Sequence, residues 1–345
     1  MGLSFSRRST EQKGPVFVVR NRLYRVLATI GQGGEATVYR CEDQSAAEYA
    51  VKVFYFSSYV RSQLPRRVKN FRKEAKILKY LSERSPHFVR LYDFEYKPLE
   101  NVGYMIMELG EASLRQVLLG APMSDEYRRI YWKQIVTILK DLEEAHVVHA
   151  DIKPENLILV NNVLKLTDLG LAFASPSAQR TVVRPKVGGT LDYMAPEVFF
   201  RQTGSKSDVW SAGIILYEMS YGRPPFIDII DRHAKIAAIT SRSPIFLGPL
   251  TDLYLFDCLK RCLNPDFRRR PTPRQLISHP YIVEKLRANF SLMTCFFFSF
   301  ACREKKNTVK RDSLDFCLFS PENQSNVIFC FLSKKRKRKR KTNFA

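Results

Sequence analysis

Four polar residues near the middle of the chain could carry chemistry together. The stretch from His149 to Asn156 reads H-A-D-I-K-P-E-N and places Asp151, Lys153 and Asn156 in what we expect to be one tight loop. Asp168 follows after a short strand-like run, in the sequence D-L-G. An Asp can accept a proton, a Lys can neutralise a phosphate, and Asn and Asp oxygens are ligands for Mg²⁺. This set suits phosphoryl transfer, in which a protein mainly aligns groups and neutralises charge.

Each of these residues can be given a role in such a transfer. We expect Asp151 to accept the proton of the attacking hydroxyl and Lys153 to steady the phosphate. Asn156 and Asp168 are then the candidates for holding metal ions. The string D-x-K-x-x-N alone could equally be an ordinary solvated loop, so the interpretation depends on the sequence around it.

A glycine-rich turn lies far upstream of this stretch. The residues from Tyr24 to Ile30 lead into Gly31, Gly33 and Gly34. Glycines lack side chains, so their backbone N–H groups can approach phosphate oxygens. Residues 37–41 read as a strand, whereas a dinucleotide-binding motif would need a helix directly after its glycines. We therefore predict a hairpin that covers phosphates.

A lysine and a glutamate are predicted to pair across the N-terminal part. Lys52 lies in the apolar run from Tyr49 to Tyr55, which predicts a buried strand. A buried ammonium without a partner is costly, so Lys52 needs a counter-ion. Glu74 lies in a stretch, 71–81, whose apolar residues recur at helical spacing. We predict that Lys52 pairs with Glu74 and reaches the phosphates; the alternative is an exposed Glu74 in a charged helix.

Two lobes are predicted from length and pattern. A chain of 345 residues is longer than one hydrophobic core usually supports. The apolar run 104–110 reads as a strand that ends in a hinge at Glu108 and Gly110, with Met107 facing the nucleotide pocket. Beyond Gly110 the pattern becomes helical, for example at 113–119 and 127–145. We place the N-terminal lobe at about 21–110 and the C-terminal lobe at about 111–286.

The later part of the chain predicts a mobile loop and an anchor. Residues 174–187 are rich in Ser, Pro and Thr and show little periodicity, as expected of a loop that gates substrate. An apolar helix is predicted at 205–219. Glu197 precedes it, and we expect Arg270 to pair with Glu197.

The two ends of the chain carry signals for location. The formal net charge is +22, and eight of the cations form the run Lys334 to Lys341. This run matches a nuclear-localisation tract read by an importin, and it could equally bind an anionic membrane or be a solvated tail. M-G-L-S-F-S at the start fits the N-myristoylation pattern, so membrane contact is expected only if Gly2 is modified. We expect a nuclear and cytoplasmic protein, with membrane association as the alternative.

The ends are also expected to lie outside the folded part. We assign residues 1–20 to a disordered leader and residues 287–345 to a tail of uncertain order. The Phe-rich patches at 290–302, 316–319 and 327–332 are too short to span a membrane, and they fit an aggregation-prone tail or an imperfect gene model better than a packed extension. Seven cysteines without a C-x-x-C pair or a secretory leader predict reduced thiols.

Taken in order, these parts resemble a complete eukaryotic protein kinase. They are the glycine turn, A-V-K at 50–52, the helical Glu, H-A-D-I-K-P-E-N, D-L-G, A-P-E, D-V-W and the late Arg. The resemblance covers about 21–286 and implies an α+β, two-lobed kinase fold with a small β-rich lobe over a larger helical lobe. It implies ATP and Mg²⁺ as cofactors, and protein substrates with Ser or Thr acceptors. The residues implied to bind the nucleotide are Gly31, Gly33, Gly34, Val38, Ala50, Lys52, Glu74, Met107, Glu108, Gly110 and Leu157.

Within the kinases, the sequence resembles the monopolar spindle family of dual-specificity checkpoint kinases. I-G-Q-G-G at 30–34, Y-M-I-M-E at 104–108 and L-K-L-T-D at 164–168 carry this resemblance. It implies that Tyr is a second acceptor and that the setting is spindle checkpoint signalling. The family usually has a long N-terminal targeting region, which we do not recognise in this sequence, so we leave a kinetochore role as an open expectation.

Three departures from the general kinase pattern remove no catalytic group. Ala150 replaces an Arg that would pair with a phosphorylated loop, Leu169 replaces the Phe of D-F-G, and Ala36 stands where a third Gly is common. The competing hypotheses are a kinase-shaped scaffold without turnover and a nucleic-acid binder built on the basic tail. The complete set of motif residues favours an active enzyme over the scaffold. A tail-based nucleic-acid binder leaves the motifs unexplained, so we expect no direct nucleic-acid role.

Overall fold

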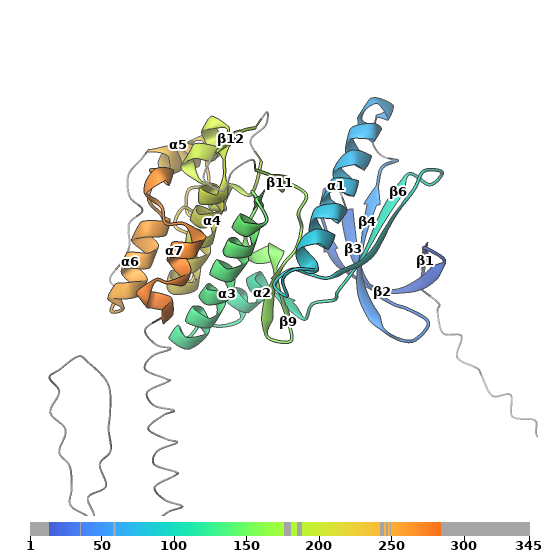
Figure 1. Ribbon diagram of the computed structural model, residues 1–345, viewed down its shortest axis with the longest axis horizontal. Coiled ribbons are helices and arrows are strands. Elements are labelled where there is room, and N and C mark those ends of the chain that lie inside the picture. Colours follow the sequence, from blue (N-terminus) through green and yellow to red (C-terminus); the bar gives the residue numbers. More distant parts are fainter. Residues whose placement is uncertain are drawn as a thin grey trace, which may run out of the picture. The chain divides into compact units, whose positions relative to one another are not determined.

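The computed structural model describes residues 14–34, 36–57, 60–175, 181–184, 188–241, 245, 248 and 250–283. In these residues the N-terminal part is an antiparallel sheet with one long helix, and the C-terminal part is mainly helical (Figure 1). This is the α+β architecture with two lobes that the sequence predicts.

Six strands form the sheet of the N-terminal lobe. The strand order is β1-β2-β3-β4-β6-β5, and every neighbouring pair is antiparallel. Every residue of β6 is buried, as is half of the neighbouring strand β4, so the core of this lobe lies along these two strands. The bounds are β1 (Val16–Val19), β2 (Arg22–Gln32), β3 (Ala36–Glu42), β4 (Glu48–Tyr55), β5 (Leu91–Lys97) and β6 (Val102–Met107).

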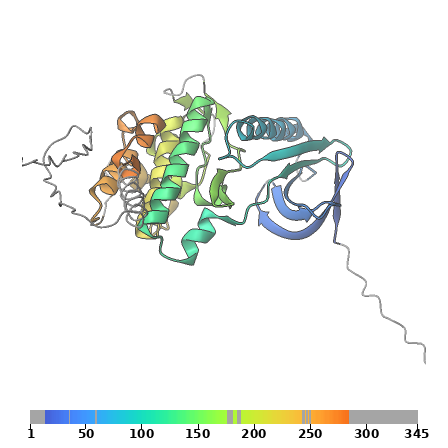
Figure 2. The ribbon, with the colours of Figure 1, turned by 60° about the horizontal axis from the view of Figure 1, so that its bottom comes forward.

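Helix α1 (Leu64–Ser82) packs on this sheet after a short turn, η1 (Arg61–Gln63). Figures 1 and 2 show it lying along the strands. The predicted helix at 71–81 is therefore present but begins earlier, where Pro65 suits a first helical turn. Its buried face holds five apolar residues and one carboxylate: Val68, Phe71, Glu74, Ala75, Leu78 and Leu81.

The leader predicted for residues 1–20 is wrong at its C-terminal end. Strand β1 pairs with β2, with Val16 opposite Arg25 and Val19 opposite Arg22. The two residues of the turn, Arg20 and Asn21, have φ angles of 48° and 64°. A tight hairpin turn needs such positive angles, and they are usually supplied by Gly or Asn. Because Arg20 is not a residue expected at the first position of such a turn, the sequence did not indicate the hairpin. Residues 1–13 lie outside the described residues.

The hinge between the lobes is held by an ion pair and a close backbone approach. Lys165 donates to both carboxylate oxygens of Glu108 at 2.8 and 2.8 Å. A Cβ atom added to Gly110 would lie 1.9 Å from Cγ2 of Ile158, so only glycine fits there without a shift. The chain then enters β7 (Ala112–Ser113) and α2 (Leu114–Gly120).

Two long helices form the centre of the C-terminal lobe. Helix α3 (Asp125–Glu144) packs on α4 (Ser205–Tyr221) and on α7 (Pro273–Ile277), and α6 (Leu253–Cys262) also packs on α4. Most of α4 is buried, as its apolar sequence predicts. The remaining elements are α5 (Arg232–Thr240), β8 (Val147–Val148), β9 (Leu157–Val160), β10 (Val163–Leu166), β11 (Phe173–Ala174), β12 (Val182–Val183), β13 (Gln202–Thr203), η2 (Pro154–Asn156), η3 (Leu191–Tyr193), η4 (Pro196–Phe200) and η5 (Phe267–Arg269).

Several predictions fall outside the described residues. They concern Gly2, the Phe-rich patches, the basic run Lys334 to Lys341 and much of the loop at 174–187. Cys41, Cys258 and Cys262 are described, and all three are buried free thiols, as predicted. In the part of the chain that the structure describes, none of the helices is long and apolar enough to cross a membrane.

Candidate functional site

Lys52 joins the two lobes at the site. It lies on β4, and its Nζ contacts Glu74 Oε1 of α1 at 2.8 Å and Asp168 Oδ1 of the C-terminal lobe at 2.9 Å. The side chains of Lys52 and Glu74 are 13% and 8% exposed, whereas that of Asp168 is 47% exposed. The predicted Lys52–Glu74 pair is therefore present. Asp168 keeps solvent access for a further ligand.

The charges in this group support one another. Burial alone would lower the pKa of Lys52, but the carboxylates of Glu74 and Asp168 outweigh burial and raise it. Burial would raise the pKa of Asp168, and the Lys52 ammonium reverses this and lowers it. Both groups are thus held in their charged forms. A fixed cation beside a half-exposed carboxylate is an arrangement that can bind phosphate and a divalent metal together.

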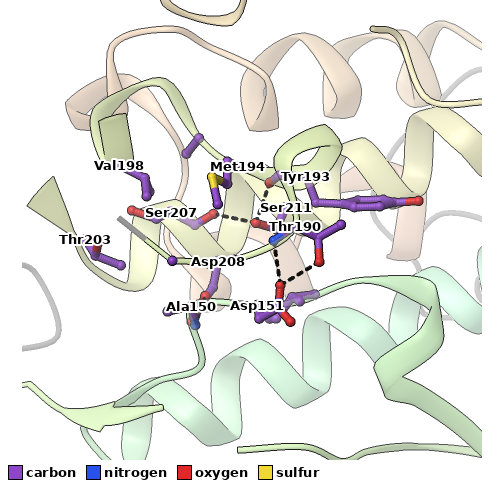
Figure 3. Close-up of a pocket in the computed structure, with 14 residues that line it drawn as sticks. Ala150, Asp151, Thr190, Tyr193, Met194, Val198, Thr203, Ser207, Asp208 and Ser211 are labelled. Atoms are coloured by element: carbon purple, nitrogen blue, oxygen red, sulfur yellow. Dashed lines mark hydrogen bonds between the residues drawn. The ribbon is translucent and has the colours of Figure 1, made fainter. Parts of the chain in front are cut away.

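The loop after β8 carries the predicted catalytic residues. Asp151 Oδ1 accepts hydrogen bonds from the backbone N–H of Thr190 at 2.8 Å and from its hydroxyl at 3.0 Å (Figure 3). Lys153 Nζ lies 2.9 Å from Asp151 Oδ2 and 2.8 Å from Thr190 Oγ1. The three side chains form a closed triangle, which fixes the Asp151 carboxylate and places an ammonium beside it.

Buried Asp208 on α4 holds the backbone of the same loop. Its oxygens accept from the N–H groups of His149 at 2.8 Å and Ala150 at 2.9 Å. Ala150 has a φ angle of 66°, a conformation that costs energy for a residue with a side chain. His149 is buried, and its Nδ1 accepts from the N–H of Asp151 at 3.2 Å. These bonds maintain the strained turn that presents Asp151.

Asn156 and Asp168 fit a divalent cation by their chemistry. The side-chain NH₂ of Asn156 donates to the backbone carbonyl of Asp151 at 2.9 Å, which leaves Oδ1 of Asn156 as the oxygen available to a metal. Asp168 offers the carboxylate oxygen that Lys52 does not contact. Hard divalent cations take about six oxygen ligands, so two protein oxygens leave room for phosphate oxygens and water.

The apolar residues implied to bind the nucleotide come from four strands. Ala50 on β4 lies opposite Met107 on β6, and both are buried. Val38 on β3 lies opposite Lys52, and Leu157 begins β9 in the buried core. These apolar side chains are suited to the flat, apolar face of an adenine ring.

The glycine turn has the predicted position between two strands. Gly31 belongs to β2, and the N–H of Gly33 donates to the carbonyl of Ala36 at 2.9 Å, where β3 begins. A strand rather than a helix therefore follows the glycines, as predicted; Glu35 lies outside the described residues.

The carboxylate of Glu108, which was predicted to bind the nucleotide, instead binds Lys165 and the N–H of Arg90. Glu108 thus fixes the hinge through its side chain.

A second ion pair lies behind the site. Arg270 donates to both oxygens of Glu197 at 2.7 and 2.8 Å, and their side chains are 0% and 5% exposed. The hydroxyl of Ser207, one residue before Asp208, also donates to Glu197 at 2.8 Å. The predicted pair is therefore present and is linked to α4.

Residues 188–198, together with α4, line a small pocket behind Asp151. Thr190, Tyr193, Met194, Ser207 and Ser211 belong to its lining (Figure 3). The hydroxyl of Ser211 donates to the carbonyl of Tyr193 at 2.8 Å and ties this segment to α4. The pocket is thus bounded by the groups that hold Asp151 in place.

Asp208 has a role in the site that its sequence context did not predict. The available signal was its position: an acid inside an apolar helix needs a buried donor. Its partners were not predictable, because they are backbone N–H groups about sixty positions away.

Loss of the Thr190 hydroxyl should impair this site without unfolding it. Thr190→Ala removes one bond to Asp151 and one to Lys153 but keeps the bond from the backbone N–H. A positioned general base contributes about 10²- to 10⁴-fold. Because the bond from the backbone N–H still holds Asp151, we expect turnover to lose only part of this, about 10- to 100-fold. Thr190→Ser keeps the hydroxyl and should recover most of the loss. Equal turnover in the two variants would contradict this role.

Asp208 should make turnover depend on pH near 6. Burial raises its pKa from 3.8 to about 6, against the influence of His149. Because the folded-state pKa lies above the unfolded one, its contribution to stability is complete below pH 3.8 and is lost as the pH rises through about 6. Function has the opposite sign, because only the carboxylate accepts from both loop N–H groups. We expect turnover to fall as the pH drops through about 6, and Asp208→Asn to be slow at neutral pH with a flatter acid limb.

Comparison with known proteins agrees with this site. The family model described as "Protein kinase domain" matches residues 24–282. "Dual specificity protein kinase TTK" of Mus musculus is 32% identical over 278 residues, which cover 76% of this chain and 32% of that protein. "Serine/threonine-protein kinase mph1" of Schizosaccharomyces pombe is 30% identical over 301 residues, 77% of this chain and 44% of that protein.

The chain covers a different share of the length of each relative. The chain spans about a third of the mouse and zebrafish (Danio rerio) relatives, at 32% and 30% of their lengths. "Aurora kinase" of Schizosaccharomyces pombe is 32% identical over 270 residues and is covered to 72%. The match spans both lobes and every catalytic motif, so the chain belongs to the protein kinase domain family.

Proposed function

We propose that this protein is an ATP-dependent protein kinase that transfers the γ-phosphoryl group of ATP to Ser and Thr hydroxyls of proteins. The contact of Lys52 with both Glu74 and Asp168 carries the proposal, because it brings a largely buried cation from one lobe to a candidate metal-binding carboxylate of the other. The fixed Asp151 carboxylate then accepts the proton of the attacking hydroxyl.

Each side chain of the site has a part in this reaction. Lys52 orients the phosphates, and Lys153 neutralises charge on the group in transfer. Thr190 holds Asp151 and Lys153 in register. The glycine turn with Val38, Ala50, Met107 and Leu157 supports the nucleotide.

We propose Mg²⁺ as the cation held by Asn156 and Asp168. These two side chains would hold the ion, and it would supply positive charge that neutralises the phosphates. Its test separates binding from catalysis: titration of Mg²⁺ into protein with a non-hydrolysable ATP analogue should tighten nucleotide binding. The same titration with Asp168→Asn should lose most of this effect.

The activity is tested by transfer of labelled phosphate to a generic basic protein and to a peptide array. We expect phosphorylated Ser and Thr peptides, with Tyr as a second acceptor, in keeping with the dual-specificity relatives. Asp151→Asn is the matched control, because it replaces only the carboxylate of the proposed base by an amide. A protein that binds ATP but transfers no phosphate would instead be a scaffold.

For the cellular setting of this activity we propose spindle checkpoint signalling, which rests on the resemblance to the monopolar spindle family.

We propose nuclear import for the basic run Lys334 to Lys341, through an importin, for a protein shared between nucleus and cytoplasm. The run has eight consecutive cations, which is the composition of such tracts. In a fluorescent fusion, deletion of the run should remove the nuclear signal. A rim at the membrane that Gly2→Ala abolishes would show myristoyl anchoring instead.

A further inference from the structure

The outer face of helix α1 carries six cations. At 100° per residue these side chains span about 140° of the helix, opposite the arc that packs on the sheet. All six residues are exposed. We call them the cationic face: Arg66, Lys69, Arg72, Lys73, Lys76 and Lys79.

No carboxylate in the described chain lies within ion-pair distance of any of the six. Lys73 instead donates to the backbone carbonyl of Ala172 at 2.8 Å, and the guanidinium of Arg72 lies 5.7 Å from the ring centre of Tyr96. Several exposed cations elsewhere are paired with carboxylates. Examples are Arg40 with Glu48 at 2.7 Å, Arg223 with Asp228 at 2.8 Å and Arg261 with Asp257 at 2.8 Å.

The cationic face also costs helix stability. Like charges three or four residues apart repel, as Lys69 does with Lys73, and Lys76 with Lys79. The first turn of α1 contains no acidic residue, and Gln63 caps it without a side-chain hydrogen bond. Cations such as Arg66 near a helix N-terminus oppose the helix dipole. The pattern therefore disfavours the isolated helix, and an external anion would relieve it.

We propose that the cationic face is a docking surface for an acidic segment of another protein, rich in Asp and Glu. Charge complementarity carries the choice of partner. The helix has 19 residues and is thus about 28 Å long, which matches about eight residues of extended chain.

Two other anionic partners fit the face less well. Within α1 the one large apolar side chain that is exposed is Tyr80, so a bilayer would gain little beyond charge. Four of the six cations are Lys, a point charge, whereas nucleic-acid recognition favours the two-pronged Arg side chain.

The position of the face gives the docking a consequence. Glu74, on the opposite arc of α1, holds Lys52, and Lys73 contacts the segment that follows Asp168. A partner bound to α1 therefore contacts the helix that positions the phosphate-binding Lys52 through Glu74. This consequence rests on the proposed kinase activity, but the docking itself does not.

The test is binding of a fluorescein-labelled 12-residue Glu-rich peptide to the full chain, followed by anisotropy. The face variant combines Arg66→Gln, Lys69→Gln, Lys76→Gln and Lys79→Gln, since Gln has a helix propensity close to that of Lys and Arg. The matched control removes four exposed cations of the other lobe: Lys260→Gln, Arg261→Gln, Arg268→Gln and Arg269→Gln. The basic run at 334–341 is present in all three proteins, so differences between them report on the changed residues.

We expect the face variant to bind about tenfold more weakly than the unchanged protein, and the control to bind within about twofold of it. The affinity of the unchanged protein should fall with added salt, and that of the face variant should fall less. Equal loss in both variants, or none in either, overturns the proposal. So does tighter, face-dependent binding to phosphatidylserine vesicles or to a DNA duplex than to the peptide.

Two further readouts separate the possible failures. The face variant should unfold at the same temperature as the unchanged protein or higher, because like-charge repulsion is removed; a lower value together with lost binding would assign the loss to folding and overturn the proposal. The measurement is repeated in Asp168→Asn protein. Unchanged peptide binding there keeps the docking independent of phosphoryl transfer.

Discussion

Asp168→Asn and Lys52→Met should each lower turnover by at least about a thousandfold. Asp168 supplies an anionic metal ligand, and Lys52 supplies the cation at the phosphates, and both act on charge that is largest in the transition state. The side chain of Asp168 is 47% exposed, so its replacement by an isosteric amide should leave the fold nearly unchanged. Lys52→Met removes one partner of buried Glu74 and should also lower the unfolding temperature.

Single-turnover transfer of labelled phosphate, measured beside the unfolding temperature, separates the two effects. Arg40→Gln is the matched control on the same sheet, since Arg40 forms an exposed pair with Glu48 and should change neither quantity. Turnover close to that of the unchanged protein in Asp168→Asn would contradict the assignment of the metal-binding carboxylate. A large drop in the Arg40 variant would mean that the sheet as a whole, rather than Lys52, limits the reaction.

The sequence was most informative where one residue type has few uses. A lysine inside an apolar strand needs a counter-ion, and this requirement predicts Glu74 as its partner before any coordinates are known. The glycine turn was predictable for a similar reason, because glycines between two alternating segments indicate a hairpin. The helical pattern around Ser205 likewise predicts a buried helix, which the structure contains.

Contacts made by the backbone were not predictable in this way. Asp208 binds the N–H groups of His149 and Ala150, which every residue except proline possesses, so no residue type points to them. Lys165 binds Glu108 from a strand that is adjacent only after folding. Strand β1 was missed because its turn uses Arg20, a residue that rarely adopts a positive φ angle.

Removal of Arg270 should be among the most destabilising single changes in the C-terminal lobe. Arg270 is fully buried, and it donates to Glu197 and to the carbonyls of Lys206 and Asn264, each at 2.8 Å or less. Arg270→Met leaves the Glu197 carboxylate buried with the Ser207 hydroxyl as its remaining partner among these groups. Breaking such a pair from one side costs about 3–5 kcal/mol.

Thermal unfolding should therefore show a fall of about 10 °C in the unfolding temperature for a domain of this size. Urea unfolding should show a lower midpoint concentration. Arg268→Met is the matched control, because that side chain is 77% exposed and its pair with Asp266 contributes little. The double variant Glu197→Gln with Arg270→Met should lose less than the sum of the single losses, since the second change removes a charge already left without its partner. Additive losses would show that the two residues act separately.

The same change should reach the catalytic loop through α4. Ser207 binds Glu197, and the next residue on α4, Asp208, holds the turn at Ala150. A shift of Glu197 should therefore move Ser207 and Asp208 together and displace the catalytic loop. We expect Arg270→Met to slow phosphate transfer even at temperatures where the protein is fully folded, and the Arg268 control to leave it unchanged. A variant that loses stability but keeps full turnover would confine the pair to a structural role.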